Sequence, residues 1–79
     1  MEITITLRGA LKKYFDGDKE RKYEVPDDCT CAEALKIAGL DYKEIPSFGF
    51  VAVNGMRVMI DSKLSPGDEL KAYSKISGG

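Results

Sequence analysis

The two glycines at the end of the sequence, Gly78 and Gly79, are the residues whose chemistry a partner could use. Glycine has no Cβ, so a Gly-Gly end can thread a narrow channel in another protein and present its carboxylate without a side-chain clash. An α-carboxylate has a pKa of about 3.5 and is a poor electrophile unless it is first activated, for example as an acyl-adenylate. We therefore expect a partner enzyme to activate Gly79, with Gly78 providing clearance. A terminus without function is the alternative, because chain ends are often free in composition.

The rest of the sequence offers no comparable chemistry. It contains no histidine, so the usual general base near neutral pH is missing. It has neither of the glycine-rich motifs that cradle nucleotide phosphates, so ATP would have to be bound by the partner. Asp27 and Asp28 precede an expected helix start, where acidic side chains favour the helix dipole. The sequence therefore predicts a protein co-substrate rather than an enzyme, with no metal or cofactor of its own.

The two cysteines, Cys29 and Cys31, are separated by one residue. In an extended segment their side chains point to opposite sides, which disfavours a disulfide. Two thiols without histidine cannot complete a four-coordinate zinc site. Cys31 falls in the first turn of an expected helix, where the dipole could lower the pKa of a thiol. The favoured interpretation is that both are small apolar residues beneath that helix.

The 79-residue chain is expected to form one domain over residues 1–76, followed by a flexible Gly-Gly tail over residues 77–79. Its 12 basic and 13 acidic residues give a net charge of −1, which does not indicate a nucleic-acid-binding surface. No apolar run approaches the roughly 18 residues of a membrane-spanning helix. The first residues lack the pattern of a signal peptide. These features predict a cytoplasmic protein that binds neither nucleic acid nor membrane.

Alternating apolar and polar residues predict five strands. They are expected at residues 2–8, 21–25, 50–53, 56–60 (starting at 56 or 57) and 69–74. Asn54-Gly55 predicts a two-residue hairpin turn between the third and fourth strands, because both residues tolerate positive φ. Residues 65–68, Ser-Pro-Gly-Asp, predict a tight turn before the last strand. The segment 41–48 is interpreted as a loop.

A capping box marks the start of the main helix, because Thr30 is followed three residues later by Glu33. The helix is expected over residues 31–38, and Gly39 suits the left-handed residue that ends many helices. One apolar face is formed by Cys31, Ala34, Leu35 and Ala38.

The spacing of Leu11, Tyr14 and Phe15 predicts a short helix of two turns between the first two strands, ended by Asp16-Gly17-Asp18. The main helix is too short to bury its apolar face alone, so it must pack across one face of a sheet. The expected fold is an α+β roll of the β-grasp (ubiquitin-like) kind. It has a mixed sheet of four to five strands, one main helix and one short inserted helix.

This order of elements resembles the MoaD/ThiS family of small ubiquitin-like sulfur carriers over essentially the whole chain. The pieces that carry the resemblance are Thr30-Cys31-Ala32-Glu33-Ala34-Leu35, Val51-Ala52-Val53-Asn54-Gly55, Leu64-Ser65-Pro66-Gly67-Asp68-Glu69-Leu70 and Ser77-Gly78-Gly79. The resemblance implies that a ubiquitin-activating-type adenylyltransferase adenylates the carboxylate of Gly79. A sulfur donor then converts it to a thiocarboxylate, and a sulfur-accepting synthase subunit takes the sulfur.

The resemblance also implies docking through an apolar patch on the sheet. Tyr73 is expected on the face opposite Leu70 and Ala72, at a position where the molybdopterin branch of the family often carries an aromatic residue. Met59 and Ile76 are possible neighbours of Tyr73 in this partner-binding patch. Ordinary packing is the alternative for each of them.

Within the family, the inserted helix and the length favour the small subunit of molybdopterin synthase over the shorter thiamine carrier. The stretch before the glycines lacks the prolines common in the molybdopterin branch. A carrier for thiamine or another sulfur-containing product therefore stays open. So do a protein modifier that forms isopeptide bonds through Gly79 and a β-grasp interaction module with an inert terminus.

Overall fold

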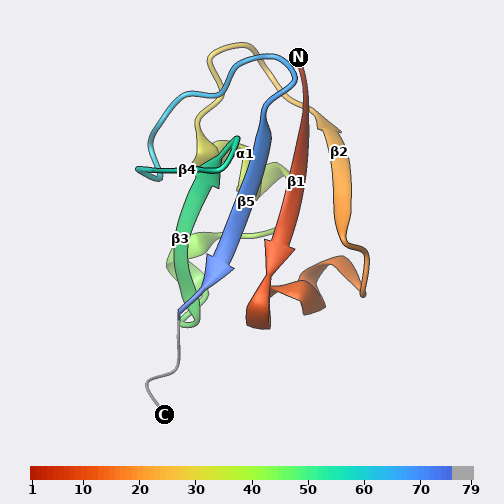
Figure 1. Ribbon diagram of the computed structural model, residues 1–79, viewed down its shortest axis with the longest axis vertical. Coiled ribbons are helices and arrows are strands. Elements are labelled where there is room, and N and C mark those ends of the chain that lie inside the picture. The colour runs from red at the N-terminus through yellow and green to blue at the C-terminus, as the bar shows by residue number, and fades with distance from the viewer. Residues whose placement is uncertain (76–79) are drawn as a thin grey trace.

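The chain, described over residues 1–75 by a computed structural model, forms a mixed sheet with a short helix behind it (Figure 1). Within these residues the sheet has five strands in the order β2-β1-β5-β3-β4. The strands are β1 (Glu2–Arg8), β2 (Glu20–Glu24), β3 (Phe48–Val53), β4 (Met56–Val58) and β5 (Glu69–Ser74). The helices are the 3₁₀ helix η1 (Gly9–Phe15), the α-helix α1 (Cys31–Ile37) and the 3₁₀ helix η2 (Tyr42–Glu44).

The first and last strands lie side by side at the centre of the sheet. β1 pairs with β5 in parallel and with β2 antiparallel, while β3 pairs antiparallel with both β5 and β4. This topology, with α1 crossing one face, is the β-grasp fold, and the predicted fold class is confirmed. The expected hairpin of the first two strands, with a short helix inserted in the connection, is confirmed as well.

The hydrophobic core lies between α1 and one face of the sheet. Strand residues alternate between the two faces, so one face of β1, β3 and β5 supplies the sheet side of the core. These residues are Ile3, Ile5, Leu7, Phe48, Val51, Leu70 and Ala72. They pack with the apolar side of α1 and with two residues of η1, namely Cys31, Ala34, Leu35, Leu11 and Phe15.

The backbone N–H groups of the first turn of α1, which have no partner within the helix, all donate hydrogen bonds to other acceptors. Thr30 and Glu33 form the predicted capping box, in which each side chain accepts a hydrogen bond from the other residue's backbone N–H. The N–H of Cys31 donates to the carbonyl of Ser62 at 2.9 Å, and the N–H of Ala32 donates to the carbonyl of Ile60 at 2.9 Å. A helix of seven residues has little stability of its own, so these bonds fix it to the segment after β4.

The end of α1 lies one residue before the predicted position. The helix ends at Ile37, with Ala38 as its cap, and Gly39 follows with φ of 95° as expected. The N–H of Leu40 donates to the carbonyl of Leu35, and the N–H of Gly39 donates to that of Lys36. These two bonds form a Schellman motif, which needs the left-handed glycine.

The connection after β1 differs from the predicted helix in type. Gly9–Phe15 is a 3₁₀ helix, in which Leu11 and Phe15 are buried, whereas Tyr14 is 37% exposed and lies outside the core. Such short 3₁₀ segments are common as connectors. The predicted stop is confirmed, because Asp16 adopts a left-handed φ of 50° directly after the helix.

Three further boundaries differ from the predictions. The expected loop over 41–48 contains η2, and β3 begins at Phe48, because Phe48 pairs with Ser74 across an irregularity in the ladder. β2 lies one residue earlier than expected, at Glu20–Glu24. β4 ends at Val58 and not at Ile60, because the carbonyl of Ile60 is used to cap α1.

Both predicted turns are confirmed. Asn54 and Gly55 have φ of 51° and 85°, and Gly67 has φ of 81°. The two turns are joined, because the side-chain amide of Asn54 donates to Asp68 at 2.9 Å. None of the helices in residues 1–75 is long and apolar enough to cross a membrane.

Candidate functional site

β5 leads the chain to the predicted reactive end from the middle of the sheet. Its carboxyl end lies at the opposite end of the molecule from the N-terminus and on the same side as η1 (Figure 1). The predicted site residues Ile76, Gly78 and Gly79 lie outside the described residues. The part of the candidate site that can be described is therefore the surface around Tyr73 and Lys75.

Two aromatic rings stack on the open face of the sheet, opposite α1. The ring centroids of Tyr73 and Phe50 are 4.6 Å apart, and their planes are inclined by 12°. The two residues are direct partners in the β3–β5 ladder, and Arg8 of β1 is the partner of Tyr73 on its other side. A stacked pair of this kind contributes about 0.5–1.5 kcal/mol beyond its buried area.

A cation extends this stack toward β4. The guanidinium carbon of Arg57 lies 4.5 Å from the ring centroid of Phe50, which is cation–π geometry. The ladder of β3 and β4 pairs Ala52 with Arg57, so Arg57 projects from the same face as the rings. We call Tyr73, Phe50 and Arg57 the aromatic platform. The half-buried rings present a flat apolar surface with a positive border.

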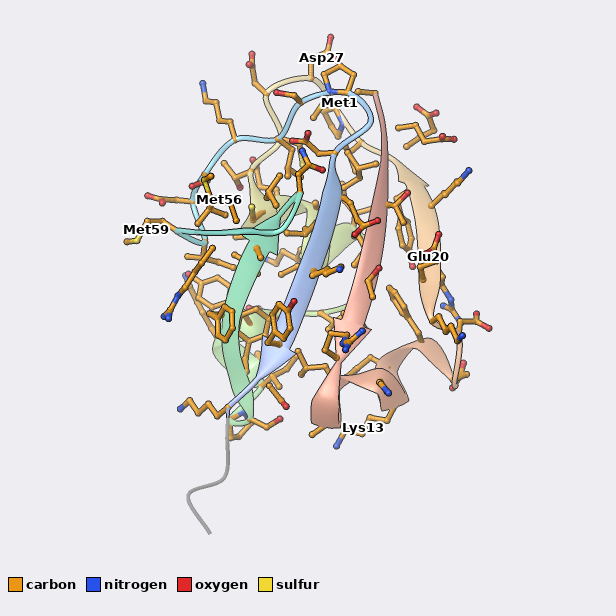
Figure 2. All side chains as sticks on the ribbon, viewed as in Figure 1. Met1, Lys13, Glu20, Asp27, Met56 and Met59 are labelled. Carbon is orange, nitrogen blue, oxygen red and sulfur yellow. The ribbon has the colours of Figure 1, made fainter. Side chains whose placement is uncertain are left out.

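Met59, predicted as a neighbour of Tyr73, lies at the edge of the sheet beyond β4. Figure 2 shows Met56 and Met59 at this edge, with both side chains directed away from the sheet. They are 71% and 73% exposed. Met59 lines, together with Phe50 and Arg57, an open depression of about 540 Å³. The platform thus connects Tyr73 with the region of Met59.

The depression beside the platform is positively charged. Lys43, Arg57 and Lys75 line it, and none of the described residues that line it is acidic. The chain as a whole has a net charge of −1, so the charge of this surface is opposite in sign to that of the whole chain. One of these cations, Lys75, is the last described residue and directly precedes residues 76–79 in the sequence. The surface is complementary to an acidic partner.

Phe50 and Arg57 are not among the site residues predicted from the sequence. The alternation along β3 placed Phe50 on the face opposite Val51 and Val53, and the Asn54-Gly55 turn fixed the pairing that brings Arg57 to that face. The alternation and the turn are both local sequence patterns, so they were sufficient to predict that Phe50 and Arg57 share a face. The contact with Tyr73 was not accessible, because it requires β3 to lie next to β5.

Cys29 and Cys31 are buried and form no disulfide with each other. Their interpretation as apolar residues beneath the helix is therefore confirmed. The suggestion that the helix start could lower the thiol pKa of Cys31 is wrong. Burial raises the pKa of Cys31 to about 11, and burial raises the pKa of Cys29 as well. The first amides of α1 already have carbonyl partners, and the Cys31 thiol lies in the core, out of contact with solvent.

Within residues 1–75, no group of three or more cysteine and acidic side chains is arranged to hold a metal ion.

Comparisons with known proteins identify the fold. SAMP1 from Haloferax volcanii, the small archaeal modifier protein 1, matches with a TM-score of 0.77 and 24% identity over the full length of both chains. A chain of the complex of subunits 1 and 2 of the molybdopterin-converting factor from Helicobacter pylori matches with a TM-score of 0.65 and 16% identity, also over both full lengths. A chain of the BexX/CysO complex from Amycolatopsis orientalis matches with a TM-score of 0.65 and 21% identity, over 98% of this chain and 99% of that chain.

The protein is therefore a β-grasp protein that shares its whole architecture with these structures. No protein-family profile matches the sequence, and no curated protein is significantly similar to it.

Proposed function

We propose that this chain belongs to the MoaD/ThiS family and serves as a sulfur carrier, a protein co-substrate whose reactive group is the carboxylate of Gly79. The supporting observation is that the strand leading to Gly79 carries Tyr73, which stacks on Phe50 beside a cluster of cations. A docking surface and the reactive end thus lie on one short stretch of chain. Full-length structural likeness to SAMP1 and to a molybdopterin-converting factor complex is consistent with this proposal.

The chemistry takes place on partners that supply every reagent. A carboxylate oxygen of Gly79 attacks the α-phosphorus of ATP bound to the partner, and pyrophosphate leaves. A hydrosulfide-level nucleophile then attacks the carbonyl carbon of the acyl-adenylate, the C–O bond to phosphate breaks, and AMP leaves. The product is a thiocarboxylate, a better nucleophile than the carboxylate, which a second enzyme can use to build a C–S bond.

In this scheme the aromatic platform docks on the activating enzyme. Aromatic and arginine residues contribute most strongly to protein interfaces, and Tyr73, Phe50 and Arg57 are of these types. The cations around the platform favour a partner surface rich in aspartate and glutamate. The partners are thus an adenylating enzyme, a sulfur donor and a sulfur-accepting synthase subunit.

Intact-mass measurement in the native host tests the proposal. The chain is isolated from cells under conditions that do not hydrolyse a thiocarboxylate, and its mass is compared with that of a variant lacking Gly79. A gain equal to the difference between one sulfur and one oxygen atom, confined to the full chain, is the expected result. A chain that stays unmodified while all sulfur-dependent cofactors are made without it would contradict the proposal.

Molybdopterin synthesis is the destination that we propose for the sulfur. The inserted helix η1 and the length of the chain favour this branch over the shorter thiamine carriers, and the Helicobacter pylori match is a chain of a molybdopterin-converting factor complex. Deleting the chain should abolish molybdenum-enzyme activity in the host and leave growth without thiamine intact. Thiamine dependence with normal molybdenum enzymes would redirect the assignment to the thiazole pathway or another product.

A protein modifier is the second candidate, favoured by the full-length match to SAMP1. Both functions begin with an adenylated Gly79 and differ in the nucleophile that follows. Isopeptide formation would yield higher-mass conjugates, and cleavage after Lys75 would leave an Ile-Ser-Gly-Gly remnant (residues 76–79) on target lysines. Digestion of host protein followed by a search for that remnant separates the two candidates.

A further inference from the structure

The last residue of β5, Ser74, lies between two glycines that approach it unusually closely. Gly9 follows β1 on one side, and Gly49 belongs to β3 on the other. A Cβ added to Gly49 would stand 2.9 Å from the carbonyl carbon and oxygen of Ser74, a separation that real Cβ atoms essentially never show. A Cβ added to Gly9 would overlap the hydroxyl of Ser74, and Gly9 has a left-handed φ of 63°. Gly49 cannot carry a side chain while the backbone of Ser74 keeps its position, and a side chain on Gly9 would displace the Ser74 hydroxyl.

Two hydrogen bonds hold the same point from opposite sides. The N–H of Ala10, at the start of η1, donates to the hydroxyl of Ser74 at 3.1 Å. The N–H of Lys75 donates to the carbonyl of Ser47, just before β3, at 2.6 Å. The backbone is therefore fixed through Lys75, the last described residue, although β5 itself ends at Ser74.

Among the glycines of the described residues, the close approach is specific to Gly9 and Gly49. The other four glycines of residues 1–75 also have positive φ, but a Cβ on any of them would meet nothing within 4 Å. These are Gly17, Gly39, Gly55 and Gly67. Turn geometry explains those four glycines. Gly49 has no such geometry, and packing against the end of β5 explains it.

We infer that Gly9, Gly49 and Ser74 form a clamp that fixes where and in which direction the chain leaves the sheet toward Gly79. The inference rests on the proposed function, in which Gly79 must reach a reacting phosphorus on a partner. Gly79 lies four residues beyond Lys75, a reach of about 14 Å when extended. When the tail is extended in the channel of a partner, a shift of its starting point at Ser74 is passed on to Gly79, and a misplacement of about 1 Å can lower a rate by about a hundredfold. The three residues are thus positioning residues that act through the chain they hold.

Kinetics with the activating enzyme of the host test this role. ATP-dependent release of pyrophosphate is measured while the concentration of the chain is varied, which separates kcat from KM for the chain. Ser74→Ala and Gly9→Ala should lower kcat about tenfold or more and leave KM within about twofold, because the docking surface is intact. Ser74→Thr, which keeps the hydroxyl, should retain most of the wild-type kcat. Gly17→Ala also places a side chain at a positive φ, but without a contact to Ser74, and serves as the matched control.

Amide exchange on the isolated chain provides a measurement that needs no partner. The Ala10 amide in Ser74→Ala and the Lys75 amide in Gly49→Ala should exchange about tenfold faster than in the wild type, with core amides unchanged. If Gly49→Ala does not fold, Ser74→Ala and Gly9→Ala decide the outcome alone. The clamp is contradicted if the Ala10 and Lys75 amides exchange as slowly in the variants as in the wild type. It is also contradicted if kcat for Ser74→Ala and Gly9→Ala is no lower than for Gly17→Ala. A wild-type chain that no enzyme activates refutes the proposed function, and the exchange data then judge the clamp separately.

Discussion

Phe50 and Tyr73 stack with their ring centroids 4.6 Å apart, and this contact joins the second hairpin of the sheet to the strand that leads to Gly79. β5 is already held in the core by Leu70 and Ala72, which face the opposite side of the sheet. The rings are therefore not needed to fill the core. Their exposed surface, with Arg57 at its border, is free to meet a partner.

Truncation of the stacked rings tests the docking role. Tyr73→Ala and Phe50→Ala should each weaken binding to the activating enzyme of the host about tenfold or more, because aromatic anchors dominate interface energies. Titration calorimetry measures the affinity, and circular dichroism verifies that the fold is retained. Tyr14→Ala is the control, since Tyr14 is a partly exposed aromatic residue on η1 outside the platform. Equal effects at Tyr14 and Tyr73 would contradict a dedicated platform.

Charge reversal at Arg57 tests the complementarity to an acidic partner. Arg57→Glu should slow association with the activating enzyme and make the rate less sensitive to salt, because the attractive charge beside Phe50 is replaced by a repulsive one. Stopped-flow association at low and physiological ionic strength measures both effects. Lys22→Glu, an exposed reversal on β2, is the matched control and should leave the rate nearly unchanged. An effect of equal size at Lys22 would show that only the overall charge matters.

The capping box of α1 is expected to matter for stability and not for docking. Thr30→Ala removes the hydroxyl that accepts from the backbone of Glu33 at 3.2 Å. The free energy of unfolding should fall by about 1 kcal/mol, which corresponds to a Tm lower by about 4–8 °C for a domain of this size. Thermal and urea melts measure the change, with Ser65→Ala as a surface control. Partner affinity should be unchanged at a temperature where the variant is folded.

Cys31 should be chemically silent in the native protein. Because burial raises its pKa to about 11, the thiol stays protonated at neutral pH and is inaccessible to reagents. A thiol-specific reagent should label Cys31 in urea and fail to label it in the folded chain. Rapid labelling of the native protein would show that the helix start opens readily.

The same shift of the Cys31 pKa predicts a pH dependence of stability. The folded pKa lies above the ordinary cysteine value of about 8.5, so the unfolded chain releases its proton first as the pH rises. The contribution of Cys31 is fully present below about pH 8.5 and is lost as the pH approaches 11. Urea melts over this range should show a smaller decline for Cys31→Ala than for the wild type. An identical decline would assign the alkaline loss to other groups.

Features that depend on neighbouring residues were determined by the sequence itself. The capping box of Thr30 and Glu33, the Asn54-Gly55 turn and the alternation of β1 were predicted and are confirmed. Each follows from local backbone preferences or side-chain periodicity, which act over a few residues. The predicted roles of Gly78 and Gly79 also derive from the sequence, and these residues lie outside the described structure.

The tertiary structure alone decided which distant residues meet. The parallel pairing of β1 with β5 brings Gly9 to Ser74, and the pairing of β3 with β5 brings Phe50 to Tyr73. It also placed Cys31 in the core, which reversed the expected direction of its pKa shift. Such contacts depend on which strands become neighbours once the apolar faces are buried together, and no local pattern encodes that choice. The sequence thus indicated the residues that we propose to react, while the fold determined the surface and the anchoring of the chain before them.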